Sequence, residues 1–184
     1  MTDIHSEAVA DSATTSDADP TARTRILAAT AAVLGRRGHS KLNLSDVATE
    51  AGVSRTTLYK WYSSKEDLLA AFGLYELRNV NDGFARAIEG LEGSEKLDAA
   101  VQYIVDFQKS YSLNQMVDIE TAHVVSQMSW VLPIMRGWIR PLLPSGEGGD
   151  VAAASVVRIA VCHYLVKSDD TEQFKAQLRH AAGI

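Results

Sequence analysis

The most informative part of this 184-residue sequence is AGVSRTTLYKWYSSKEDLL, residues 51–69. Gly52 stands where a sharp turn between two helices requires a positive φ, and Val53 follows as an apolar plug beneath that turn. Ser54 can cap the next helix, which the pattern predicts over residues 55–62. The stretch therefore predicts two short helices joined by a tight turn.

The residues just before this stretch supply the first of the two helices. Asn43 is a capping residue for a helix over residues 44–51, and Asp46 can reach back toward the free backbone donors at its start. Ala48 is small where two crossing helices approach each other, and Leu58 points back into the crevice between them. This spacing predicts a helix-turn-helix, whose second helix lies in the major groove of DNA. An ordinary helical hairpin with a Gly in the same place is the alternative.

A longer helix is predicted ahead of the motif, over residues 22–37. Its apolar side chains recur in steps of three and four and define one buried face. Arg36 and Arg37 suit the negative C-terminal end of a helix, and Gly38 supplies the left-handed residue that ends it. Six apolar residues of the following motif are predicted to join the same core: Leu44, Val47, Ala48, Val53, Leu58 and Tyr62.

Charge is distributed very unevenly along the chain, whose net charge is −5. Residues 1–20 carry −5, residues 21–65 carry +6 and residues 66–184 carry −6. The basic block coincides with the helix-turn-helix, as expected for a protein that binds nucleic acid. Chance clustering of basic residues on a solvated face is the alternative reading of the charge taken by itself.

The composition limits the class of protein. Residues 1–20 are small, acidic and poor in large apolar side chains, so we expect a disordered tail. The single cysteine, Cys162, cannot form an internal disulfide or a Cys-based metal site. No segment has the apolar length of a membrane span or the pattern of a secretory signal, which favours a cytoplasmic protein.

The segment TLYKWYSSKEDLL, with AGVSRT directly before it and an Arg-rich helix upstream, resembles the DNA-binding domain of the TetR-like (tetracycline repressor) family of bacterial transcription regulators. The resemblance covers residues 22–72, roughly a quarter of the chain. Tyr62 stands where Phe is commoner in the family, Ser63 where Pro often stands, and Trp61 where a small or polar residue or His often stands. These departures bear on the base preference rather than on the fold.

The resemblance and the side-chain chemistry assign the same DNA contacts. Arg55 and Thr56 begin the recognition helix and are predicted to read base edges, since an Arg can bind guanine O6 and N7 as a fork. Ser45 is predicted to reach the same groove edge. Residues predicted to contact the phosphate backbone are Asn43, Thr57, Tyr59, Lys60, Trp61 and Lys65. For Trp61, a place in the core is an equal alternative.

The resemblance implies an all-α fold in three parts: a tail (residues 1–20), a helix-turn-helix domain (residues 21–65) and a helical effector-binding and dimerisation domain (residues 66–184). Ser63 or Ser64 caps a long helix that continues to about residue 90 and links the last two parts. Further helices are predicted over residues 94–110, 113–130, 134–143, 150–166 and 171–182. Residues 141–149, rich in Pro and Gly, are predicted to be a mobile loop.

A ligand pocket is predicted among the middle helices, because aromatic and Met side chains around a few polar groups suit a lipophilic effector. The candidates are Phe72, Tyr75, Phe84, Tyr103, Phe107, Tyr111, Met116, His123, Gln127, Met128, Trp130, Met135 and Trp138. The same residues also make up ordinary helical cores, which is the alternative for each of them. His123 and His163 lack the spacing of a metal site, and we expect neither a metal nor a cofactor.

The helix predicted over residues 150–166 is apolar almost all round, so it should be buried on more than one side. With the last helix, it resembles the C-terminal pair that forms a four-helix dimer interface in the family. The predicted interface residues are Val151, Ser155, Val156, Ile159, His163, Phe174 and Leu178. Burial of the same residues in the core of a monomer is the alternative.

Two functions from different classes follow from these patterns. The first is a homodimeric transcription regulator, most simply a repressor, that binds a palindromic operator on double-stranded DNA and is released by a small lipophilic effector. The second is a small all-helical enzyme or lipid carrier that uses the same pocket. The sequence contains no HExxH, phosphate-loop or dinucleotide motif, and we predict that the protein is not an enzyme.

Overall fold

A computed structural model describes residues 20–111, 113–166 and 170–184, all of them in helices or in the turns between helices. The predicted disordered tail lies outside these residues, except for Pro20, which begins the first helix. The elements are α1 (Pro20–Lys41), α2 (Leu44–Glu50), α3 (Arg55–Trp61), α4 (Lys65–Ala87), α5 (Gly93–Ser110), α6 (Met116–Ile119), α7 (Thr121–Ile139), η1 (Arg140–Leu142), α8 (Glu147–Leu165) and α9 (Thr171–Ala182). The all-α fold predicted from the sequence is confirmed.

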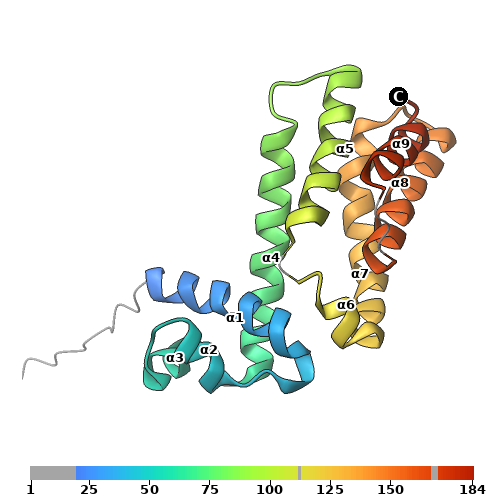
Figure 1. Ribbon diagram of the computed structural model, residues 1–184. Helices are drawn as coiled ribbons and strands as arrows, with labels where there is room; N and C mark the ends of the chain where they lie inside the picture. The colour runs from blue at the N-terminus through green and yellow to red at the C-terminus, as the bar shows by residue number, and fades with distance from the viewer. Residues whose placement is uncertain (1–19, 112, 167–169) are drawn as a thin grey trace, which may run out of the picture.

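The chain is arranged in two bodies joined by α4 (Figure 1). Helices α1, α2 and α3 form the first body, and α4 leaves it to run along the second, where α5, α7, α8 and α9 pack together. The short helix α6 lies at the end of the second body that faces α1, and the two helices are in contact. The end of α1 is therefore the place where the second body touches the first.

The capping residues predicted from the sequence are those that begin the helices. Asn43 Oδ1 accepts a hydrogen bond from the Asp46 backbone N–H at 2.9 Å, and Ser54 Oγ accepts one from the Thr57 N–H at 3.0 Å. Asp46 was predicted to reach back to a backbone donor, but its carboxylate instead accepts a bond from the side-chain amide of Asn43. Ser64, rather than Ser63, caps α4.

Positive φ angles occur at the two glycines that were predicted to interrupt the helices of the first body. Gly52 has φ 63°, and the chain turns there from α2 to α3. Gly38 has φ 78° and breaks α1, so that the last residues of α1 form a separate turn of helix. An L side chain at either position would be strained, because φ in this region brings Cβ against the backbone.

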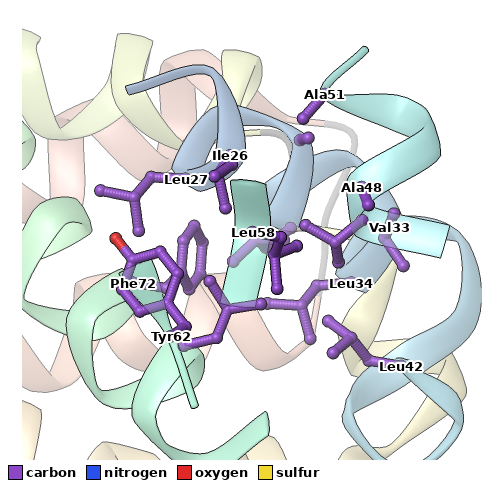
Figure 2. Packing of buried hydrophobic residues seen from close by; sticks show 14 of the residues in the cluster. Ile26, Leu27, Val33, Leu34, Leu42, Ala48, Ala51, Leu58, Tyr62 and Phe72 are labelled. Atoms are coloured by element: carbon purple, nitrogen blue, oxygen red, sulfur yellow. The ribbon is translucent and has the colours of Figure 1, made fainter. Parts of the chain in front are cut away.

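The core of the first body is built around Leu58 of α3, which is fully buried. Figure 2 shows Leu58 in the middle of side chains from α1, α2 and the residues that follow α3. Val47, Ala48 and Tyr62 are buried in the same cluster, as predicted, while Leu44 and Val53 are partly buried against it. Burial of a Leu side chain contributes about 1.5–3 kcal/mol, so this cluster fixes the angle between α2 and α3.

The same core extends into the second body. Four of its buried members come from the segment around α6 and the start of α7: Leu113, Met116, Val117 and Val124. A second cluster joins the end of α4 to α5, α7, α8 and α9. The two bodies therefore share buried apolar surface, and movement of α6 would disturb the packing of α1.

Two predictions about the middle of the chain are wrong. Residues 113–130 do not form one helix, since α6 ends at Ile119 and Glu120 is non-helical with φ −142° and ψ 57°. Residues 121–139 then form one helix, although a break was predicted between Trp130 and Ile134. Pro133 is tolerated inside α7 because Pro133 and Ser129 are both exposed, so water can hydrate the carbonyl that the proline leaves without its helical donor.

The segment predicted to be a mobile loop, residues 141–149, is instead held by Arg140. The Arg140 guanidinium donates to the Asp150 carboxylate at 2.7 Å and to the carbonyl oxygens of Pro144 and Gly146 at 3.1 and 3.2 Å. The hydrogen bond from Arg140 is the main reason that the pKa of Asp150 lies below its ordinary value. One side chain thus fixes the turn between η1 and α8.

Candidate nucleic-acid interface and effector cavity

Helix α3 presents a polar and basic face to solvent. Arg55, Thr56, Tyr59 and Lys60 are all exposed, Tyr59 to 54%, while Leu58 on the opposite side is fully buried. A helix that buries one face and exposes Arg, Thr, Tyr and Lys on the other can enter a groove of DNA without unfolding any part of the core. These four residues therefore form the exposed face of α3.

Four other residues predicted to contact DNA also make contacts within the chain. Thr57 Oγ1 hydrogen-bonds Ser54 Oγ at 2.9 Å, and Lys65 Nζ donates to the Ser40 carbonyl at 3.1 Å. Asn43 is occupied by the cap described above. Trp61 packs partly against the core, and the Arg23 guanidinium lies 5.9 Å from the centre of its ring. Contacts of these side chains with phosphate would have to share or replace these bonds.

Two ion pairs arrange the basic residues of the first body. Arg36 pairs with Glu50 at 2.5 Å and Arg37 with Asp46 at 2.6 Å, so two arginines at the end of α1 brace the helix α2. Ser45, predicted to touch the groove edge, is half-buried on α2. Within the described residues Arg55 and Lys60 form no ion pair, which leaves the positive charge of α3 available to a polyanion.

The second body contains a cavity of about 400 Å³ that is bounded by residues of α1, α4, α5, α6, α7 and α8. All of the candidates for a ligand pocket line it except Tyr75, which packs against the core of the first body instead. Tyr75 was misassigned because the stripe of α4 changes neighbours along the helix. Lining residues that the sequence analysis did not single out include Leu34, His39, Glu76, Gln108 and Tyr164.

The cavity holds a small group of polar side chains in an aromatic wall. Burial raises the pKa of the Glu76 carboxyl above its ordinary value, and a hydrogen bond with Tyr111 partly offsets that effect. Burial also raises the pKa of Tyr111, with Glu76 as the next cause, and raises the pKa of Tyr164 to about 12. Glu76 was missed because, on α4 read by itself, it lies among the polar positions of an amphipathic helix.

The cavity reaches the first body through His39. This residue follows the break at Gly38, lines the cavity, and stacks its ring on that of His123 with 4.2 Å between the ring centres. Beside it, the Glu120 carboxylate accepts bonds from the backbone N–H groups of His39 at 2.9 Å and Ser40 at 2.8 Å. Burial would raise the pKa of Glu120, but the bonds from Ser40 and His39 outweigh it and hold that pKa below its ordinary value.

The residues predicted for a dimer interface divide into two groups. Val156, Phe174 and Leu178 are buried within the chain itself, in the cluster formed with α5, so their assignment to an interface is wrong. Their apolar spacing was read correctly, but their partner is the neighbouring helix. Val151 is 60% exposed, and Ser155, Ile159 and His163 are half-buried. His163 stacks on Phe174, with the ring centres 3.7 Å apart.

Neither a metal centre nor a membrane span is found in the described part of the chain. Residues 20–111, 113–166 and 170–184 hold no group of three or more His, Cys, Asp or Glu arranged around a common point. None of the helices in these ranges combines the length and the apolar composition that crossing a bilayer requires.

An all-helical chain with a basic helix-turn-helix, joined by a long helix to a body that encloses a cavity, defines the class of helix-turn-helix DNA-binding proteins with a ligand-sized cavity. The model of the family described as 'Bacterial regulatory proteins, tetR family' matches residues 26–72, which run from within α1 through α2 and α3 into α4. Residues 26–72 are thus similar to the DNA-binding domain of this family, and the chain is TetR-like.

Two relatives of the chain are named as HTH-type transcription regulators. The chain is 37% identical over 87 residues to the HTH-type transcriptional repressor LfrR of Mycolicibacterium smegmatis, a match that covers 47% of this chain and 44% of LfrR. It is 29% identical over 103 residues to the HTH-type transcriptional activator FasR of the same organism, covering 55% and 47%. The matches thus span less than half the length of these relatives.

The fold matches solved structures over most of the chain. A TetR transcription regulator from Haloarcula marismortui superposes with a TM-score of 0.72 over 88% of this chain and 96% of the other, at 19% sequence identity. At that identity the likeness concerns the fold, including the arrangement of the helical second body around α4.

Proposed function

We propose that this protein is a ligand-responsive transcription regulator that binds a palindromic operator as a homodimer. The observation that carries the proposal is the exposed basic face of α3, built on a TetR-family domain whose core continues into a cavity-bearing body. Release of the operator when a lipophilic effector fills the cavity would make the protein a repressor.

Base recognition is assigned to the start of α3. Arg55 and Thr56 stand in the first turn, exposed and free of the caps that occupy Ser54 and Thr57. A guanidinium at this place can bind guanine as a fork, and a threonine can bond a base or touch a thymine methyl. Tyr59 and Lys60, further along the same face, suit the phosphates that flank the groove.

Dimerisation is assigned to the outer face of α8, because the residues still exposed there are separated by four or seven positions, which places them on one side of a helix. Val151, Arg158 and Cys162 are exposed on α8, and Val166, the residue that follows the helix, is 72% exposed. A two-fold dimer formed through this face would supply the pair of recognition helices that two half-sites, one helical turn or about 34–36 Å apart, require.

Coupling between cavity and DNA is assigned to the end of α1. Leu34 and His39 belong to the DNA-binding body and also line the cavity, so a ligand there touches the first body directly. A ligand that separated the stacked rings of His39 and His123 would shift the chain at Gly38. That shift would disturb the neighbouring Arg37–Asp46 ion pair, which joins α1 to α2. A coupling free energy of about 1–3 kcal/mol is enough to lower operator occupancy several-fold or more.

The test is binding of the purified protein to the intergenic DNA upstream of its own gene, with Arg55→Ala and Lys60→Ala as variants. Arg55→Ala should cost about 1–3 kcal/mol and relax the preference at one base pair. Lys60→Ala should weaken all sequences alike and, because Lys60 is assigned one phosphate, reduce the slope of log affinity against log salt by about one. Arg78→Ala, an exposed arginine on α4, is the matched control and should leave binding unchanged.

If Arg55→Ala retained full affinity with unchanged base preference, α3 would not read bases. If the folded protein bound no DNA at low salt but bound lipophilic ligands, the carrier function that uses the cavity would be favoured over regulation.

A further inference from the structure

The described side chains that line the cavity include one acidic residue, Glu76, and no lysine or arginine. Glu76 lies on α4 and is half-buried; most of the lining is aromatic or aliphatic, and it also includes His39, Gln108, His123 and Gln127. A partly buried carboxyl with no lysine or arginine beside it is unfavourable in its charged form. A ligand that brings a positive charge would remove this cost.

The aromatic side chains near Glu76 favour the same charge. Tyr111 lines the cavity with Glu76 and is near enough to influence its pKa, and the ring centre of Tyr111 lies 4.6 Å from that of Phe107 and 6.2 Å from that of Tyr164. The faces of aromatic rings attract cations, and more strongly where water is excluded. Tyr103 continues the row, 6.1 Å from Phe107. The carboxyl thus stands at a wall of electron-rich rings.

We infer that the effector is a lipophilic amine in its protonated form, with its ammonium group held by Glu76 and Tyr111 and its apolar body lying along the aromatic and aliphatic wall. This inference rests on the proposed function, since it names the ligand of the same cavity. An acid of similar shape would place its carboxylate against Glu76 in a cavity whose described lining offers no lysine or arginine. A neutral ligand would fill the apolar space and leave Glu76 as it is.

The experiment compares three ligands that share a ten-carbon chain: decylammonium, decanol and decanoate. Their binding to the full-length protein is measured by titration calorimetry at neutral pH, below the concentrations at which decylammonium and decanoate form micelles and decanol separates from water. Hydrogen bonds to charged groups exceed neutral ones by an amount that corresponds to about tenfold in affinity. Decylammonium should therefore bind at least about tenfold more tightly than decanol, and decanoate should bind most weakly.

The variant Glu76→Gln keeps the size and the hydrogen-bonding capacity of the side chain and removes its charge. It should lower the affinity for decylammonium by about tenfold or more and leave the affinity for decanol within about twofold. Tyr111→Phe should give a smaller loss for decylammonium. Glu89→Gln, the same change at an exposed position just after α4 and outside the cavity, is the matched control and should bind all three ligands like the wild type.

Equal affinity of Glu76→Gln and wild type for decylammonium, with both proteins folded by their thermal melts, would overturn the inference. Tighter binding of decanoate than of decylammonium would overturn it as well. If Glu76→Gln did not fold, Tyr111→Phe and the ranking of the three ligands on the wild type would still decide the matter. Operator binding is assayed separately, so a failed ligand ranking refutes the inference and leaves the DNA-binding function standing.

Discussion

Glu120 is the residue whose removal tests the connection between the two bodies most sharply. It ends α6 and begins α7, yet both of its carboxylate oxygens accept backbone N–H bonds, at 2.9 and 2.8 Å, from the residues that follow the break in α1. The substitution Glu120→Gln is nearly isosteric. It turns one of the two acceptors into an NH₂ donor, which would face a backbone donor.

The expected loss follows from these two bonds. Hydrogen bonds to a charged group contribute about 1.5–3 kcal/mol each, but Ser40 is exposed and water will replace part of its bond. Glu120→Gln and Glu120→Ala should therefore both lower the free energy of unfolding by about 1–3 kcal/mol. Urea denaturation followed by circular dichroism measures this loss. Asp118→Asn, an exposed carboxylate on α6, is the control and should change stability little.

The pH dependence provides a second readout for Glu120. Its pKa in the folded protein lies below the ordinary value of 4.5, so its stabilising effect is complete above 4.5 and is lost as the pH falls through the folded-state pKa. The difference in stability between wild type and Glu120→Gln should thus be full at neutral pH and shrink in acid. Equal stability of the two proteins at neutral pH would refute the stabilising role given to the bonds that Glu120 accepts from His39 and Ser40.

Three further substitutions test separate parts of the structure. The Tyr62 hydroxyl is buried with no hydrogen-bond partner among the described residues, so Tyr62→Phe should raise the free energy of unfolding by up to about 1–3 kcal/mol. Tyr59→Phe, at an exposed site, is the control and should leave stability unchanged. A loss of stability in Tyr62→Phe would show that the hydroxyl is bonded. Gly149→Ala would place Cβ 2.0 Å from the Pro144 carbonyl oxygen, so it should lower the free energy of unfolding by at least about 1–3 kcal/mol in urea denaturation. A Gly149→Ala variant as stable as the wild type would contradict this packing. Val151→Asp should shift the protein from dimer to monomer in sedimentation, with its helix content retained, and an unchanged mass would place the interface elsewhere than on α8.

The first body could be predicted from the sequence because its signals are local. The caps at Asn43 and Ser54, the turn at Gly52 and the inward position of Leu58 all depend on residues within one or two helical turns. Each of these features appears in the structure where the sequence placed it. The exposed face of α3 follows from them, because the side of the helix opposite Leu58 is exposed.

The second body could be predicted only in part, because its details depend on distant contacts. The break at Glu120 goes with bonds to residues 80 and 81 positions away in the chain, which no local pattern reports. The apolar spacing of Phe174 and Leu178 showed that they are buried but not against which helix. Glu76 occupies a polar position of α4, and its place in the cavity depends on residues of α5 and α8 that are distant in the sequence.

The central claim is that α3 reads an operator, and footprinting of the intergenic DNA upstream of the gene tests it most directly when wild type and Arg55→Ala are compared at one stated salt concentration. The account predicts a protected palindrome whose half-sites lie one helical turn apart, about 34–36 Å, and a weaker and less selective footprint with Arg55→Ala. A folded wild-type protein that protected no such site at low salt, or an Arg55→Ala variant with an identical footprint, would contradict it.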